Sequence, residues 1–301
     1  MKILIATHPF SRISPEPMSL IIDEADIISN PYNRRLKANE VSELIKDVDI
    51  VIAGTEPYHD ALKNSNIKCI CRVGIGLDNI PLDYCRENNI AVSYTPDAPS
   101  KAVAELTVAN IINLTRHILP AHRNFSKWTR YMGRRMDELT IGIIGMGRIG
   151  KIVYSLLKPF GCNILCNDIR EIKGHMLVDA YYIFKYSDVV TIHIPGGDNI
   201  NYLNRQKLEL MKPGSYIINT SRGRVVSEPD LVYALSTKLG GAALDVFTDE
   251  PYSGPLTMLK NVILTPHIAA STEASRYQME LEASTDCLNF IYGRPLINDA
   301  L

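Results

Sequence analysis

Three residues of complementary chemical types each come shortly after an apolar, strand-like run. They are Arg222, Glu250 and His267, a cation, an acid and an imidazole. The carboxyl ends of parallel strands meet at one edge of a sheet, and ligands bind there. If these runs are parallel strands, we expect the three side chains to share that edge.

This combination of types matches what the reduction of a 2-keto acid requires. A guanidinium such as that of Arg222 can bind a carboxylate and polarise the neighbouring ketone. A histidine can give a proton to the keto oxygen as hydride arrives, and a carboxylate beside it keeps the ring protonated. Each residue alone also fits a structural role: Arg222 at a strand end, Glu250 in a solvated turn before Pro251, and His267 as a buried histidine.

A glycine motif upstream indicates the source of the hydride. The run Thr140–Ile144 ends in Gly145-Met-Gly147-Arg-Ile-Gly150, and a helical pattern follows. Gly145 would make the turn, Gly147 would let a pyrophosphate approach the backbone, and Gly150 would let helix and strand pack closely. The amides and the positive helix end would face the phosphates.

The context of this motif favours a dinucleotide over an ordinary glycine-rich turn. A second strand-like run, Cys162–Asp168, ends in an acid 23 residues after Gly145. In a Rossmann unit this position carries the carboxylate that accepts the ribose hydroxyls. Asp168 would also repel a 2′-phosphate, so we expect NAD rather than NADP, although Arg170 could soften this preference.

The bulk composition excludes several other classes of protein. The 301 residues carry a net charge of −1, so no basic surface suggests nucleic acid or an anionic membrane. No apolar run approaches the ~18 residues of a membrane span, and the N-terminus is expected to be a strand rather than a signal peptide. The six cysteines lack zinc or redox spacing, which favours free thiols in the cytoplasm and no metal site.

Apolar runs alternate with helical patterns, which predicts an α/β protein with mainly parallel sheets. Long helical patterns cover residues 100–117 and 271–291. The predicted strands are Ile3–Ala6, Asp49–Ala53, Lys68–Arg72, Ile90–Ser93, Thr140–Ile144, Asn163–Asn167, Asp188–His193, Ser215–Asn219, Ala242–Val246 and Val262–Leu264.

The order of these elements predicts two domains. The last ~30 residues are too few to fold alone, so we expect them to return to the first domain. The prediction is a discontinuous substrate-binding domain, 1–97 with 271–301, and a Rossmann domain, 98–270, with the ligand in a cleft between domains.

Together these segments resemble the D-isomer-specific 2-hydroxyacid dehydrogenase family, from about residue 68 to the C-terminus and more loosely before it. The resemblance implies two doubly wound α/β domains, a Rossmann domain inserted into a flavodoxin-like one. The matching motifs are Arg72-Val-Gly-Ile-Gly-Leu-Asp-Asn, Val103-Ala-Glu-Leu-Thr, Gly145-Met-Gly-Arg-Ile-Gly, Asn219-Thr-Ser-Arg-Gly, Asp245-Val-Phe-Thr-Asp-Glu-Pro and Pro266-His-Ile-Ala-Ala-Ser.

The resemblance also implies a role for each matching residue. Arg222 would bind the substrate, His267 would be the acid and base, and Glu250 would tune His267. Asp245 would hold the nicotinamide carboxamide, and the Gly74-Ile75-Gly76 turn would hold the substrate carboxylate through its amides. Further cofactor contacts would be Gly145, Gly147, Arg148, Ile149, Gly150, Asp168, Pro195 and Thr220.

Within the family the resemblance is strongest to the phosphoglycerate dehydrogenases. It rests on Arg72, Asp78-Asn79, Thr95–Ser100 and Lys127–Gly133. Arg72 and Arg130 could therefore contact a substrate phosphate, although both could instead be surface arginines. We expect no C-terminal regulatory domain. The expected pair is 3-phosphoglycerate and 3-phosphohydroxypyruvate, with hydroxypyruvate, glyoxylate or another 2-keto acid as alternatives.

Two segments depart from the family pattern. The loop after Pro195, Gly196–Ile200, is one residue shorter and lacks a threonine, and the stretch 170–188 is short and rich in aromatic residues. A homodimer is expected, because the 101–117 pattern is apolar on more than one face. A non-catalytic protein that senses NAD(H) remains a second hypothesis.

Overall fold

The computed structural model describes residues 1–301 and divides them into two compact units. Unit 1 contains residues 1–99 and 271–301, and unit 2 contains residues 100–270. No helix in either unit is long and apolar enough to cross a membrane.

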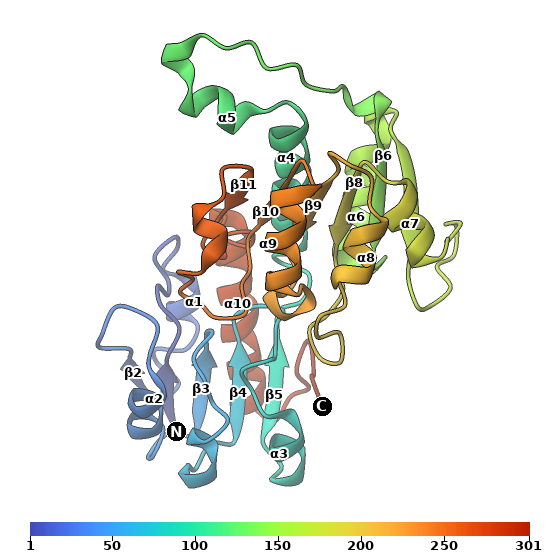
Figure 1. Ribbon diagram of the computed structural model, residues 1–301. Helices are drawn as coiled ribbons and strands as arrows, with labels where there is room; N and C mark the ends of the chain where they lie inside the picture. Colours follow the sequence, from blue (N-terminus) through green and yellow to red (C-terminus); the bar gives the residue numbers. More distant parts are fainter. The chain divides into compact units, whose positions relative to one another are not determined.

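Unit 1 is built on a five-stranded parallel sheet with the order β2-β1-β3-β4-β5 (Figure 1). This is the flavodoxin-like order. The strands are β1 (Lys2–Ile5), β2 (Asp26–Ser29), β3 (Ile50–Ala53), β4 (Cys69–Arg72) and β5 (Ala91–Tyr94). The helices are α1 (Glu16–Ser19), α2 (Ala38–Leu44), α3 (Leu82–Glu87) and α10 (Glu273–Ile291).

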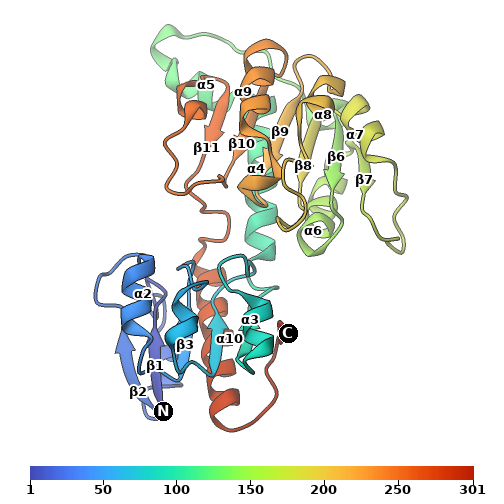
Figure 2. The same ribbon diagram turned by 60° about the horizontal axis from the view of Figure 1, so that its bottom comes forward.

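Helices cover both faces of this sheet, which explains why its central strands β3 and β4 are buried along their whole length. On one face Val41 of α2 and Cys85 of α3 join a buried core, and on the other Met279 and Ala283 of α10 do so. Figure 2 shows α10 along the sheet. The segment 271–301 thus supplies the covering of one face.

Unit 2 is built on a six-stranded parallel sheet with the order β11-β10-β9-β8-β6-β7. The strands are β6 (Thr140–Ile144), β7 (Asn163–Asn167), β8 (Val189–Ile192), β9 (Tyr216–Asn219), β10 (Gly241–Leu244) and β11 (Val262–Leu264). The helices are α4 (Ser100–Thr115), α5 (Ile118–Arg123), α6 (Arg148–Leu157), α7 (Ala180–Tyr186), α8 (Arg205–Leu210) and α9 (Glu228–Thr237).

This second sheet is also doubly wound. Ile111 of α4 and Val153 of α6 are buried against one face, and Phe184, Leu208 and Leu231 of α7, α8 and α9 against the other. The predicted fold class, two doubly wound parallel-sheet domains, is therefore confirmed. The strand order reverses at β6, and a nucleotide binds at such a switch point.

The sequence prediction missed one strand, β2. Its four residues, Asp26-Ile-Ile-Ser29, have two polar ends, and none of the four is fully buried. It lies at the edge of the sheet and pairs only with β1. A short edge strand has a weak apolar signal, whereas each of the ten predicted runs overlaps an observed strand.

The stretch 170–188 forms no strand beside β7. Its pairing with β7 is one parallel bridge between Cys166 and Leu177. Val178 N–H donates to Cys166 O at 2.9 Å, and Asn167 Nδ2 donates to Val178 O at 2.8 Å. β7 is therefore the outermost strand of the sheet, covered by a single extended segment.

The glycine loop between β6 and α6 depends on its lack of side chains. Gly145 has a φ of +93°, which favours glycine, and a Cβ on Gly150 would lie 2.0 Å from Gly145 O. A Cβ on Gly147 would meet no atom within 4 Å. Gly150 thus permits the close packing of α6 against β6, while Gly147 leaves open space above the loop.

We predict that Gly150→Ala lowers the free energy of unfolding by about 1–3 kcal/mol, because the new methyl group overpacks this contact. Urea denaturation followed by circular dichroism checks this. The matched control is Gly147→Ala, which should keep the wild-type midpoint. Equal midpoints for Gly150→Ala and wild type would contradict the packing role.

Candidate active site

Arg222, Glu250 and His267 follow three adjacent parallel strands, β9, β10 and β11. They therefore lie on loops at the same edge of the unit 2 sheet. This is the carboxyl edge at which parallel sheets bind ligands.

His267 and Glu250 are directly paired. The Nδ1 atom of His267 lies 2.8 Å from Oε2 of Glu250, and both side chains remain partly exposed. The other carboxylate oxygen, Oε1, accepts the amide of Phe247 at 3.0 Å. Because Nδ1 is engaged, Nε2 is the ring nitrogen that remains for a reacting molecule.

Asp245 holds the loop that carries His267. Its side chain is fully buried, and its oxygens accept Thr265 Oγ1 at 2.6 Å, Ile268 N–H at 2.9 Å and Ala269 N–H at 2.8 Å. His267 also donates its own amide to Asp245 O at 2.9 Å and has a φ of +54°. These bonds fix a backbone conformation that is unusual for a histidine.

The loop that carries Glu250 is held by contacts of Phe247 and Tyr252, which lie on either side of Glu250 in the sequence. The rings of Phe247 and Tyr252 stack with centroids 4.3 Å apart, and Tyr252 Oη donates to Glu228 Oε1 at 2.8 Å. Burial, reinforced by Glu228, raises the pKa of Tyr252 to about 12, so the phenol keeps its proton. Tyr252 and Glu228 lie outside the sequence motifs described above, so the sequence did not predict that they support this loop.

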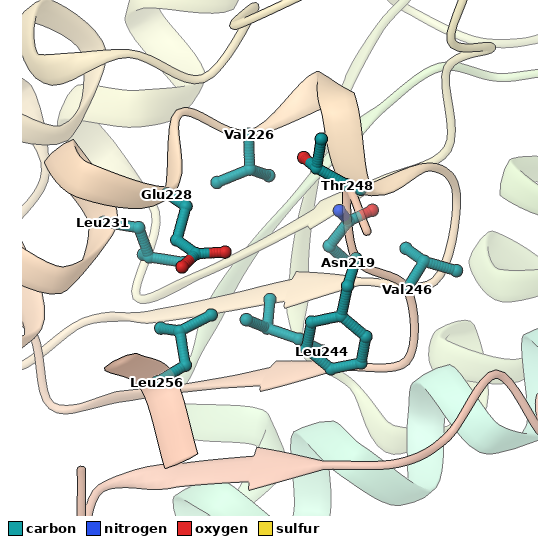
Figure 3. Close-up of a pocket in the computed structure, with 10 residues that line it drawn as sticks. Asn219, Val226, Glu228, Leu231, Leu244, Val246, Thr248 and Leu256 are labelled. Carbon is teal, nitrogen blue, oxygen red and sulfur yellow. The ribbon is translucent and has the colours of Figure 1, made fainter. Parts of the chain in front are cut away.

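The loops after β9 and β10 meet around a small cavity (Figure 3). A Cβ on Gly223, next to Arg222, would lie 1.9 Å from the Phe247 carbonyl carbon, so the two loops approach as closely as backbones allow. Arg222 itself donates from Nη1 to Ser221 O at 2.7 Å. The side chains lining the cavity include Asn219, Val226, Glu228, Leu231, Leu244, Val246, Thr248 and Leu256.

The glycine loop and α6 fit the diphosphate of a dinucleotide. α6 begins at Arg148 directly after Gly147, so the amides of Arg148, Ile149 and Gly150 belong to its first turn. Such amides lack a partner within the helix and attract anions. The open space at Gly147 lets a phosphate reach them.

Asp168 lies beside this loop at the end of β7. Its carboxylate accepts Met146 N–H at 2.8 Å and Arg170 N–H at 3.0 Å. Burial alone would raise the pKa of Asp168, but these amides and the Arg170 guanidinium outweigh it and lower the pKa. The side chain is therefore an anion, as binding of ribose hydroxyls and rejection of a 2′-phosphate require.

The loops after β8 and β9 contain the two remaining predicted cofactor contacts. Thr220 is nearly buried, with Oγ1 3.0 Å from Thr107 Oγ1 on α4. Pro195 is exposed, and its carbonyl accepts Asn199 Nδ2 at 3.0 Å, which closes the shortened loop. Burial lowers the pKa of neighbouring His193 to about 3, so its imidazole is neutral. No sequence motif had pointed to His193.

The predicted substrate-binding turn lies in unit 1, after β4. Gly74 has a φ of +142° and donates its amide to Thr95 Oγ1 at 2.8 Å. Its amide is therefore already used inside unit 1, and the amides of Ile75 and Gly76 are the better candidates for binding a carboxylate.

Arg72, a predicted phosphate contact, forms hydrogen bonds within unit 1. Its side chain is buried, and the guanidinium donates from Nε to Gly76 O at 3.1 Å and from Nη1 to Val73 O. It braces the turn from within. Arg130 is exposed, in the segment after α5.

Comparison with known proteins gives the family. The model of the D-isomer specific 2-hydroxyacid dehydrogenase NAD-binding domain matches residues 108–269. A D-3-phosphoglycerate dehydrogenase of Synechocystis is 34% identical, and the match covers 86% of this chain but only 50% of that protein. A hydroxypyruvate reductase of Thermotoga maritima is 33% identical, with 91% of this chain and 94% of that protein covered.

A solved structure agrees with these relatives. The D-lactate dehydrogenase of Aquifex aeolicus, complexed with NAD and lactic acid, has a TM-score of 0.89 and 26% identity over 100% of this chain and 99% of that chain. This chain belongs to the D-isomer specific 2-hydroxyacid dehydrogenase family, whose members are NAD-dependent oxidoreductases. The family predicted from the sequence motifs is confirmed, and residues 108–269 carry its NAD-binding domain.

We predict that Asp245→Asn lowers the free energy of unfolding by about 1–3 kcal/mol, since an amide group cannot accept all three donors of the loop. The rate of keto-acid reduction should fall as well, because the loop that carries His267 loses hydrogen bonds to Asp245. Urea midpoints and initial rates check this. Asp249→Asn, at an exposed acid of the neighbouring loop, should match wild type. An Asp245→Asn protein with wild-type stability and activity would refute the role.

Proposed function

We propose that this protein interconverts a D-2-hydroxy acid and its 2-keto acid with NAD(H). The observation that carries the proposal is the 2.8 Å His267–Glu250 pair, on the same sheet edge as Arg222 and in a unit with a dinucleotide loop. The oxidoreductase class of the family supports it.

Four residues of unit 2 have distinct roles in the proposed reaction. Bound NADH supplies the hydride. Arg222 binds the substrate carboxylate and polarises the ketone, and His267 Nε2 gives its proton to the keto oxygen. Glu250 stabilises the imidazolium and keeps Nε2 aimed outward. Asp245 holds the His267 loop, and the resemblance to the family supports it as the residue that would hold the nicotinamide carboxamide.

Two substrate classes follow from the relatives. The likeness to phosphoglycerate dehydrogenases favours 3-phosphohydroxypyruvate, whereas the engagement of Arg72 with its own turn favours an unphosphorylated acid such as hydroxypyruvate or glyoxylate. NADH oxidation with these acids, pyruvate and branched 2-keto acids tests the proposal. Absence of turnover with every acid would favour the alternative, a non-catalytic NAD(H)-sensing protein.

The exposed apolar side chains of one segment support a homodimer. Between α4 and β6 the chain extends away from the sheet through α5 (Figure 1), and Phe125, Trp128 and Met132 are 68%, 71% and 92% exposed. We propose that a second copy covers them. Light scattering should give about twice the chain mass of 33.6 kDa, and a mass near 34 kDa would refute the dimer.

All six cysteines are free, which agrees with the proposed cytoplasmic location. A thiol reagent should count six thiols in the denatured, unreduced protein. A lower count would point to an oxidising compartment.

We predict that kcat/KM favours NADH over NADPH. Asp168→Ala should shrink this preference, because the anion that repels a 2′-phosphate is lost. Initial rates with both cofactors check this. Glu171→Ala, at an exposed acid nearby, is the matched control. A wild-type preference for NADPH would overturn the assignment.

We predict that His267→Ala lowers kcat by ~10²–10⁴-fold while NADH binding is kept. Glu250→Gln should also lower kcat, though less than His267→Ala does, because the imidazole keeps a hydrogen-bonding neighbour at Nδ1 but loses the carboxylate. Initial rates and NADH fluorescence titration check both. Near-normal kcat in His267→Ala would refute the mechanism, and wild-type kcat in Glu250→Gln would refute the role of Glu250.

A further inference from the structure

The turn after β4 contains two neighbouring amides that donate to no group of the chain. They belong to Ile75 and Gly76, and both residues are partly exposed. Successive backbone N–H groups in a turn can form a binding site for an anion. How well these two amides bind a carboxylate depends on how the rest of the turn is held.

Thr95 holds the beginning of this turn. The amide of Gly74 donates to Thr95 Oγ1 at 2.8 Å, and the amide of Thr95 donates to Gly74 O at 3.1 Å. Thr95 directly follows β5 and is 1% exposed. The Gly74 amide also reaches Arg72 O at 3.0 Å, a contact between close neighbours in the chain. Thr95 therefore supplies the link between Gly74 and the adjacent strand.

The conformation of Gly74 explains why this link matters. Gly74 has a φ of +142°, and a Cβ there would lie 2.8 Å from Arg72 Nη1. Only a glycine leaves room for the guanidinium at this place. A glycine also has more backbone conformations available than any other residue. The two hydrogen bonds with Thr95 select one of them.

Asn79 holds the end of the turn against the loop after β3. Its Nδ2 atom donates to Gly54 O at 3.1 Å and to Glu56 O at 2.7 Å, and its carbonyl accepts Tyr58 N–H at 3.0 Å. Glu56 is 2% exposed and Tyr58 is fully buried. Asn79 thus ties the end of the turn to buried residues of a neighbouring loop.

We propose that Thr95 and Asn79 are positioning residues for the substrate, because they hold the two ends of the turn so that its two unpartnered amides can bind the substrate carboxylate. The inference rests on the proposed function, which takes this turn as the carboxylate site. Both residues act through the backbone of the turn. A turn that is ordered before the substrate arrives loses less conformational freedom on binding, which improves affinity.

The first test replaces the Thr95 hydroxyl with a methyl group. Thr95→Val removes an acceptor of the Gly74 amide, so KM for the 2-keto acid that wild type reduces most efficiently should rise about tenfold while kcat is largely kept. The dissociation constant of NADH should stay at the wild-type value, because the dinucleotide loop belongs to unit 2. Thr95→Ser keeps the hydroxyl and should retain the wild-type KM.

A purely structural role would give a different result. Partial unfolding lowers the number of active molecules, so it reduces the apparent kcat and leaves KM unchanged. Thr115→Val is the matched control, since Thr115 is also 1% exposed and its hydroxyl donates to Ile111 O at 2.8 Å. Thr115 ends α4 next to Leu114, which lies beside Gly241 at the first residue of β10. Its KM should equal that of wild type.

The second test addresses the other end of the turn and decides the matter if Thr95→Val fails to fold. Asn79→Ala removes both donors to the loop after β3, so KM should again rise with NADH binding kept. Asn88→Ala is its control, because Asn88 Nδ2 also donates to a carbonyl of unit 1, Tyr84 O at 2.9 Å, but on the exposed end of α3. This control should keep the wild-type KM.

A wild-type KM in either folded variant would overturn the role of that residue and leave the dehydrogenase activity intact. If wild type reduces no acid, calorimetry with oxamate, an unreactive analogue of a 2-keto acid, replaces KM in the presence of NADH. Weaker oxamate binding by Thr95→Val and Asn79→Ala than by wild type and the two controls would support the inference, and equal binding would overturn it. Absence of oxamate binding by wild type would refute the carboxylate site and the inference with it.

Discussion

The site in unit 2 depends on one buried carboxylate, that of Asp245. A charge with no access to water must be satisfied by the protein, and here a hydroxyl and two amides of a single loop satisfy it. That loop cannot rearrange without stranding the charge. The position of His267 is thereby fixed. Its Nδ1 atom meets Glu250, whose own loop is held by the hydrogen bond between Tyr252 and Glu228.

Much of this arrangement could be predicted from local signals in the sequence. The glycine spacing at 145–150 and the apolar runs of the sheets are short-range patterns, and the placement of Arg222, Glu250 and His267 on one edge follows from parallel strands. Strand β2 escaped prediction because its four residues are half exposed and polar at both ends. The contact between Glu250 and His267 depends on the directions of their side chains, which the spacing of residues in the sequence does not specify.

The direction of Arg72 illustrates the same limit. An arginine before a glycine turn is compatible with a side chain that points to a ligand or one that folds back on the turn. Here the turn folds so that the guanidinium donates to the carbonyls of Val73 and Gly76, and it fits beside Gly74 because that residue has no side chain. Asp245 and Tyr252 act through partners 20 or more residues away in the sequence, so no local motif predicts these structural roles.

The reduced border of the unit 2 sheet has a consequence for solubility. Because the sheet ends at β7, that strand presents backbone groups which another chain could pair with, and such edges are templates for aggregation. The bridge at Leu177, the Val178 amide and the Asn167 side chain occupy part of this edge. The segment around residues 177–178 thus covers part of the β7 edge and leaves fewer backbone groups with which a strand of a neighbouring molecule could pair.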